Sequence, residues 1–225
     1  MPADASRPTR RGSVTEVELK LQTNDRMVLR RLARRRRLGD ALLGAPHTVG
    51  ELDRYLDTAD GRFAAVAWAC RLRSREGSTI VSLKGPRLAR TGRSVLHSRL
   101  ELEGAATADP DPQAWPPSPA RSYVRRLSCG HALVERFQLR QRRTERSVEV
   151  AGERIGVLSL DEVEVIHEHQ PIGRLLVVEL ELAAGMPAAR ATRASQALEA
   201  IQGLHPDPRS KLEHALAMLG GERDS

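Results

Sequence analysis

The feature of this chain that most constrains its fold is an alternation of charged and apolar residues near its beginning. Three charged and three apolar residues alternate there: Glu16, Val17, Glu18, Leu19, Lys20 and Leu21. Successive side chains of a β-strand point to opposite faces, so a strand here carries its charges on one face and its apolar side chains on the other. One strand of this kind is an ordinary half-exposed strand with a solvated face. The pattern becomes informative because it recurs.

The same alternation is found in four further stretches. Two are mainly acidic and two are cationic: Arg99, Glu101 and Glu103 around Leu100 and Leu102; Glu179 and Glu181 around Leu180; Arg71 and Arg73 around Leu72; and Arg140 and Arg142 around Gln141. Solubility alone does not explain several strands that each bear like-facing charges. We therefore predict an α+β fold, in which an antiparallel eight-stranded β-barrel has a lumen lined with charge and helices packed outside.

A lumen that mixes both signs of charge suits one kind of ligand. Clustered carboxylates repel one another unless a cation lies among them, and hard divalent ions such as Mg²⁺ or Mn²⁺ take oxygen ligands. Clustered arginine and lysine side chains need an anion, and the guanidinium fork matches phosphate oxygens. Together the two sets indicate a site for a metal-bound polyphosphate.

Eight short segments make this indication more specific. In chain order they are Glu16-x-Glu18-x-Lys20, Tyr55-Leu56-Asp57-Thr58, Arg71-Leu72-Arg73, Ser82-Leu83-Lys84-Gly85, Leu96 to Glu101, Leu160-Asp161, Glu179-Leu180-Glu181-Leu182 and Ser210-Lys211. The series resembles the triphosphate tunnel metalloenzymes, also called the CYTH superfamily, and is most similar to the bacterial inorganic triphosphatases. The resemblance covers residues 14 to 215, which is nearly the whole chain.

The resemblance implies an activity and a cofactor. It implies that the charged lumen is a triphosphate tunnel, in which Mg²⁺ or Mn²⁺ assists hydrolysis of a phosphoanhydride bond of inorganic triphosphate (tripolyphosphate). The metal ligands that it implies are strand carboxylates that face each other across the tunnel: Glu16, Glu18, Asp161, Glu179 and Glu181. Metal-oriented water would attack the terminal phosphorus, with positioning and charge neutralisation supplying most of the catalysis.

The expected phosphate clamp is the set of lumen-facing cations. Its members are Lys20, Arg71, Arg73, Lys84, Arg99, Arg140, Arg142 and Lys211, of which Lys211 rests on the resemblance alone. Arg143 is left out, because it alternates with Arg142 and so points to the other face. The candidate catalytic residues are Lys20, Glu18 and Glu101. Glu101 and Glu103 are weaker candidates as metal ligands, because one of the two could simply neutralise Arg99.

Length and composition agree with one compact domain. The chain has 225 residues and a net charge of +7, which attracts anions and favours weak, salt-sensitive contacts with nucleic acid. Two cysteines without metal-ligand spacing, no long apolar run and no apolar leader predict a cytoplasmic protein with no membrane partner. The arginines at positions 34–37 are interpreted as a solvated helix face, because no recognition motif or stacking aromatic residue accompanies them, so no specific nucleic acid is expected.

The remaining segments can be assigned from turn and cap signals. We expect a disordered tail over residues 1–13, a CYTH domain over residues 14–220 and a Pro-rich loop at about residues 105–120. Helices are predicted from about residue 23 to 38, from 187 to 201 and from 209 to 220. Residues 137–143 and 146–150 are predicted to form two strands that pair with each other.

Several functions share such a tunnel. A class IV-type adenylyl cyclase is the first enzymatic alternative, followed by thiamine or nucleoside triphosphatases acting on an organic triphosphate. The sequence offers no clear aromatic platform for a thiazole or a base, which favours the inorganic substrate. A module that only binds polyphosphate or a nucleotide is the non-enzymatic alternative, but binding an anion does not require acidic strands. The sequence leaves the oligomeric state open.

Overall fold

The described part of the protein consists of one large antiparallel sheet and five α-helices. The computed structural model describes residues 14–87 and 96–221, and the side chains of Glu16 and Arg99 and the expected tail at residues 1–13 lie outside the described part. The strands are β1 (Val14–Thr23), β2 (Arg37–Leu38), β3 (Ala41–Leu43), β4 (His47–Thr58), β5 (Ala69–Arg75), β6 (Ser78–Arg87), β7 (Leu96–Ala106), β8 (Leu133–Val150), β9 (Glu153–His167), β10 (Gln170–Leu182) and β11 (His205–Pro206). The helices are α1 (Arg26–Arg34), α2 (Arg62–Ala65), α3 (Pro119–Ser128), α4 (Thr192–Glu199) and α5 (Lys211–Gly221), with 3₁₀ turns η1 (Pro112–Ala114) and η2 (Ala188–Ala191).

Eight of the strands close into a ring. Pairing runs in the order β8, β4, β5, β6, β7, β1, β10, β9, and β9 pairs back to β8, so every junction is antiparallel and the ring has no open edge. The predicted eight-stranded barrel is therefore confirmed. The register between β1 and β10 places Glu18 opposite Glu181 and Lys20 opposite Glu179, which brings the charged faces of these two strands together.

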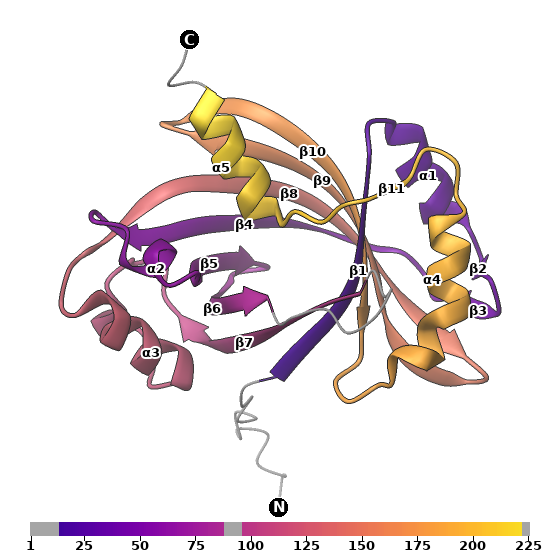
Figure 1. Ribbon diagram of the computed structural model, residues 1–225, viewed down its shortest axis with the longest axis horizontal. Coiled ribbons are helices and arrows are strands. Elements are labelled where there is room, and N and C mark those ends of the chain that lie inside the picture. The colour runs from indigo at the N-terminus through magenta and orange to yellow at the C-terminus, as the bar shows by residue number, and fades with distance from the viewer. Residues whose placement is uncertain (1–13, 88–95, 222–225) are drawn as a thin grey trace, which may run out of the picture.

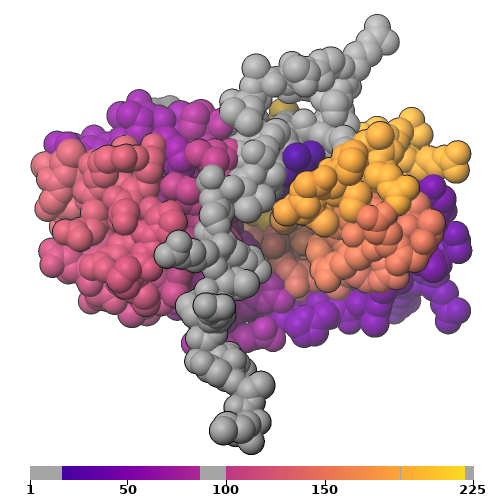
Figure 2. Space-filling model, turned by 90° about the horizontal axis from the view of Figure 1, so that it is seen from below, coloured from indigo at the N-terminus to yellow at the C-terminus, as the bar shows by residue number. Residues whose placement is uncertain are grey.

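Helices cover the outside of the barrel on two sides (Figure 1). On one side α1 and α4 pack on the apolar face of β1, β9 and β10, where Leu19, Leu180 and Leu198 are fully buried. On the other side α2 and α3 cover β5 and β6, with Leu72 and Val124 in a second core. The apolar residues that alternate with the charged ones thus point outward into these two cores, as the sequence predicts. Seen from below, α3 and its neighbouring strands form one side of the molecule, and β9, β10 and α4 form the other (Figure 2).

Helix α5 has a different position, because it lies over the concave side of β8, β9 and β10 (Figure 1). Ala215 of this helix packs with Leu139, Val163 and Val165 in a third cluster. Leu139 lies on β8 two residues from Gln141, so it shares the inner face of the strand with Gln141. The helix therefore closes one end of the barrel and brings its own N-terminus to the lumen.

Some predicted boundaries differ from the observed ones. The first helix ends at Arg34 rather than near residue 38, because the chain turns extended at Arg35 and enters β2. The helix expected from residue 187 begins as the 3₁₀ turn η2, and α4 starts only at Thr192. The expected loop at 105–120 is shortened by β7, which runs to Ala106, and by α3, which starts at Pro119.

The prediction of two short strands at 137–143 and 146–150 is wrong. They form a single strand, β8, which pairs with β4 on one side and β9 on the other. Thr144 and Glu145, the two polar residues between these segments, form no turn, because their side chains form hydrogen bonds to neighbouring strands. Thr144 shares a 2.8 Å hydrogen bond with Thr48, and Glu145 accepts two from Arg75.

No helix within the described residues is both long enough and apolar enough to span a membrane.

Candidate active site in the barrel lumen

The barrel encloses a small cavity of about 260 Å³ whose walls are highly charged. Six carboxylates and six cations are among the described residues that line it: Glu18, Glu101, Glu103, Glu145, Glu179 and Glu181, and Lys20, Arg71, Arg73, Lys84, Arg143 and Lys211. Ten of these, Glu103 included, are residues that the sequence predicts for the site, and all but Lys211 lie on the alternating strands β1, β5, β6, β7 and β10. The formal charges of this described lining cancel.

Strands β1 and β10 supply the first group of charges. The Lys20 ammonium is 5% exposed and lies 3.1 Å from Glu18 Oε1 and 3.3 Å from Glu179 Oε1. Burial would raise the pKa of the Glu179 carboxyl, but Lys211, Lys20 and Arg143 outweigh that effect and hold this pKa well below its ordinary value. Glu179 is consequently an anion that three cations share.

A buried carboxylate holds the two arginines of β5. Asp53 of β4 is fully buried and accepts hydrogen bonds from Arg73 Nε at 2.7 Å, Arg73 Nη2 at 2.8 Å and Arg71 Nη1 at 3.2 Å. Gln141 of β8 adds a fourth bond of 2.7 Å. Burial alone would raise the pKa of Asp53, but Arg71 and Arg73 lower it far below its ordinary value. The carboxylate thus fixes both guanidiniums in the wall of the lumen.

A second buried carboxylate organises the end of the lumen near α5. Asp161 of β9 is fully buried and accepts two hydrogen bonds from Arg143, of 2.8 and 2.7 Å, and one from Lys211 Nζ at 2.5 Å. Burial would raise its pKa, and the attraction of Arg143 and Lys211 lowers it instead. Lys211 also lies 2.9 Å from Glu179, so one network joins β8, β9, β10 and α5.

The position of Lys211 follows from the local sequence at the start of α5. Ser210 and Glu213 form a reciprocal capping box, in which each side chain accepts a hydrogen bond from the backbone N–H of the other residue. One turn on, buried His214 lies 2.8 Å from Asp207, whose own N–H donates to the Lys20 carbonyl oxygen. These contacts anchor the first turn of α5 beside β1 and hold Lys211 in the lumen.

Strands β6 and β7 complete the wall. Lys84 lies 3.3 Å from Glu101, and the Ser82 hydroxyl donates to Glu103 at 3.0 Å while it accepts from Arg71. Asp57, from the tyrosine-x-aspartate-threonine segment, plays a structural part, since its carboxylate accepts backbone hydrogen bonds from Phe63 and Ala64 at the start of α2. The segment therefore shapes the turn that leads into β5.

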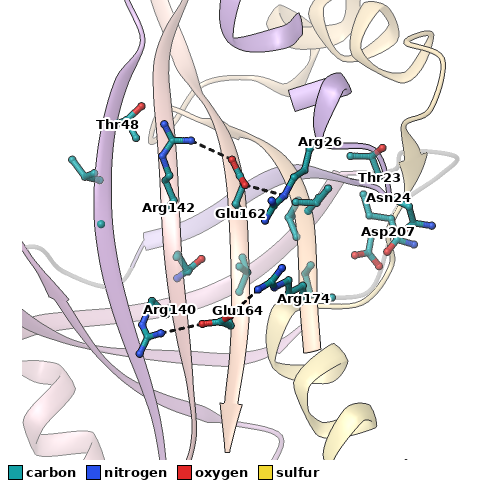
Figure 3. A pocket seen from close by; sticks show the side chains of 18 residues that line it. Thr23, Asn24, Arg26, Thr48, Arg140, Arg142, Glu162, Glu164, Arg174 and Asp207 are labelled. Atoms are coloured by element: carbon teal, nitrogen blue, oxygen red, sulfur yellow. Dashed lines mark hydrogen bonds and ion pairs between the residues drawn. The ribbon is translucent and has the colours of Figure 1, made fainter. Parts of the chain in front are cut away.

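Two predicted members of the phosphate clamp are not in the lumen. The prediction that Arg140 and Arg142 face it is wrong, because both side chains are 67% exposed on the outer face of β8, where they pair with Glu164 and Glu162 of β9 (Figure 3). Arg143, predicted to point away, faces the lumen. Alternation does not fix the phase of β8, since both faces of this strand carry arginine and no helix among the described residues covers its outer face at this point.

Four further lumen-side residues were not predicted: Glu51, Asp53, Gln141 and Glu145. Glu51 and Asp53 alternate with Leu52 on β4, so the signal that located the other charged strands is present there as well. Asp161 was predicted as a metal ligand, but the cations bonded to it place it behind the cavity lining. The predicted side chains of Glu16 and Arg99 lie outside the described part, and the backbones of these two residues pair between β1 and β7.

The donor set of the lumen fits a hard divalent cation. No three His, Cys, Asp or Glu side chains in the described part converge as a ready-made metal site. Glu18 and Glu181 nevertheless lie directly opposite each other on paired strands, where like charges destabilise the sheet unless a cation offsets them. Carboxylate oxygens are the ligands that Mg²⁺ and Mn²⁺ prefer.

An apolar hollow of about 430 Å³ adjoins the lumen. Tyr55, Ala69, Lys84 and Leu212 line both spaces, so the two share a wall. Aromatic side chains form part of its wall: Trp68 beside Gly85, and the stacked rings of Tyr55 and Phe137, whose centroids are 4.7 Å apart. Aromatic side chains thus line a space beside the lumen, which the sequence alone does not indicate.

Comparison with known proteins agrees with this architecture. The model of the CYTH domain matches residues 14–216. HpAC1 from Hippeastrum, described as a candidate adenylyl cyclase with a dominant triphosphatase activity, has a similar structure with a TM-score of 0.66 and 20% identity; the match covers 90% of this chain and 95% of that one. A candidate adenylate cyclase (bh2851) from Bacillus halodurans gives 0.61 and 18%, covering 89% and 97%. No curated protein matches the sequence.

Proposed function

Because the chain belongs to the CYTH domain family, we propose that it is a metal-dependent triphosphatase that hydrolyses a phosphoanhydride bond of inorganic triphosphate. The observation that carries this proposal is the enclosed cavity, in which six cations and six carboxylates face one another from the strands and from α5. Its similarity to HpAC1, for which a dominant triphosphatase activity is described, supports the same reaction class.

The cations of the lumen supply the phosphate contacts. Arg71 and Arg73 reach the cavity with N–H groups that Asp53 does not use, and Lys84 and Lys211 reach it from β6 and α5. Arginine and lysine donors form charge-assisted hydrogen bonds to phosphate oxygens. A linear triphosphate held along this row is fixed in orientation, which lowers the entropic part of the barrier.

The charge of the lumen supports a requirement for a divalent cation. The formal charges of the described cavity lining cancel, whereas a triphosphate carries several negative charges. A further cation is therefore needed to offset the charges of the triphosphate. Glu18, Glu179 and Glu181 would hold Mg²⁺ or Mn²⁺, with Glu16 added from the same strand. When bound, such an ion neutralises charge on the phosphate oxygens and makes water a better nucleophile.

The chain's own residues also bear on the water and the leaving group. Lys20, held between Glu18 and Glu179, is placed to donate a proton or hydrogen bond to a phosphate oxygen. Glu101, which is bonded to Lys84, is the candidate to accept a proton from the attacking water. Closure of the barrel by α5 limits the entry of bulk water at that end.

A second candidate substrate is an organic triphosphate. The apolar hollow beside the lumen has aromatic walls, and inorganic triphosphate has no apolar part to fill them. The Trp68→Ala variant separates the two substrates. For an organic triphosphate such as ATP or thiamine triphosphate, loss of stacking raises KM roughly tenfold, whereas hydrolysis of tripolyphosphate is unaffected. Equal effects on both substrates would remove the organic candidate.

The experiment that tests the proposal measures phosphate release from tripolyphosphate with Mg²⁺ or Mn²⁺, with and without EDTA. We expect turnover that EDTA abolishes, and Glu18→Gln should lose most of it while the fold is retained, since only a charge is removed. Glu135→Gln is the matched control, because Glu135 lies on the outward side of the barrel, paired with Arg54. Full turnover in EDTA contradicts the metal requirement, and equal losses in both variants contradict the site.

A further inference from the structure

A groove of about 910 Å³ lies on the outside of the barrel. Its floor is the outer face of β8, β9 and β10, between the start of α1 on one side and Thr48 of β4 on the other (Figure 3). The floor belongs to neither the lumen nor the two helix-covered cores. Arg140 and Arg142, which the sequence singled out as phosphate ligands, lie here.

Two rows of alternating charge cross the floor. In one, Glu162 lies 3.2 Å from Arg142 and 3.2 Å from Arg26 of α1. In the other, Glu164 lies 3.0 Å from Arg140 and 3.4 Å from Arg174 of β10 (Figure 3). Each row therefore has two guanidiniums for one carboxylate. The rows lie two residues apart along the strands, which corresponds to roughly 7 Å.

The carboxylates orient these guanidiniums without covering them. The four arginine side chains are 53–69% exposed, whereas Glu162 and Glu164 are 27% and 24% exposed. A guanidinium has five N–H donors in a fixed fork, so one contact with a glutamate leaves most of its donors directed to solvent. The floor thus presents oriented, exposed donors suited to phosphate oxygens.

Helix α1 extends the positive surface away from the groove. Arg26, Arg30 and Arg34 are spaced four residues apart, so they form one exposed stripe, while Val28, Leu29 and Leu32 are buried against the barrel. Arg35, Arg36 and Arg37 follow and are exposed as well. Within the described residues, Arg34, Arg35 and Arg36 have no ion-pair partner, and this potential attracts polyanions.

The shape and lining of the groove select among polyanions. The floor is three strands wide, or about 10–15 Å, which admits a single linear chain rather than a duplex. A single-stranded nucleic acid would bring bases that need aromatic stacking partners, and no aromatic side chain lines the groove. We propose that this groove and the exposed stripe of α1 bind a linear inorganic polyphosphate chain at a site separate from the lumen.

The test is a titration of each protein with long-chain inorganic polyphosphate, in EDTA, at several salt concentrations. The variant is Arg140→Gln/Arg142→Gln, and the matched control is Arg125→Gln/Arg126→Gln, which removes the same charge from exposed positions of α3. We expect the first variant to weaken binding about tenfold and to reduce the salt slope by about 1.4, as two lost phosphate contacts require. The control should match the wild type.

A second variant reverses the sign of the effect. Glu162→Gln/Glu164→Gln removes two negative charges from the floor, so polyphosphate binding should become tighter. Unchanged binding in both floor variants, or equal weakening in the α3 control, overturns the proposal. Tighter binding of duplex DNA than of polyphosphate, lost in Arg140→Gln/Arg142→Gln, overturns the choice of polyanion. Melting temperatures of all variants check that the fold is retained. The result does not depend on whether the lumen hydrolyses triphosphate, because the titration measures binding alone.

Discussion

The lumen and the outer groove are built from the same residue types, and β8, β9 and β10 contribute to both, yet the two regions differ in burial. In the lumen, Arg71, Arg73 and Arg143 are 10–12% exposed and bonded to carboxylates that are fully buried. In the groove, Arg140 and Arg142 are 67% exposed and their carboxylates are partly in solvent. An unpaired charge is costly only where water cannot reach it. From the two faces of β8 we therefore expect that burial, more than composition, decides what an ion pair contributes to stability.

The largest difference between lumen and groove is expected in the loss of folding stability when one carboxylate of an ion pair is removed. Asp53→Asn removes the buried anion that holds Arg71 and Arg73, and breaking a buried ion pair from one side costs about 3–5 kcal/mol. Glu164→Gln removes an exposed partner and should cost less than about 1 kcal/mol. Urea unfolding of both variants measures the two values. Similar losses of unfolding free energy in the two variants would mean that water reaches Asp53 and its arginines.

A smaller effect is expected in acid. Asp53, Asp161 and Glu179 have a pKa that is lower in the folded protein than in the unfolded chain. Each one stabilises the fold fully above its unfolded pKa, near 4, and that stabilisation is lost as the pH falls toward the folded pKa. The melting temperature should fall steeply below about pH 4, and less steeply in Asp161→Asn. A slope that is identical in the variant would show that Asp161 is not a main contributor.

The sequence predicts which side chains face the lumen only for strands that have one charged face and one apolar face. On β1, β5 and β10 the charged residues alternate with apolar ones, so the register assigns Lys20, Arg71 and Glu179 to the lumen without a structure. On β8 both faces are polar, and alternation alone cannot tell which face is inside. The place of Arg143 is then fixed by Asp161 on the neighbouring strand, which no pattern local to β8 reveals.

Lys211 illustrates another limit. Its side chain reaches the lumen because α5 folds back over β8, β9 and β10, and this path depends on tertiary contacts such as the pair of His214 and Asp207. Helical periodicity predicts that α5 exists and nothing about where it docks. Only the resemblance to the family indicated this residue.

The most direct test of the claim that the lumen, and not the groove, holds triphosphate is a thermal shift titration. The melting temperatures of wild type, Arg71→Ala and Arg142→Ala are followed against tripolyphosphate concentration, at fixed salt with Mg²⁺ present. Loss of one charge-assisted contact is worth about 1.5–3 kcal/mol, so Arg71→Ala should need roughly ten- to a hundredfold more ligand for the same shift. Arg142→Ala should follow the wild type. Shifts that are unchanged in Arg71→Ala and reduced in Arg142→Ala would contradict the account.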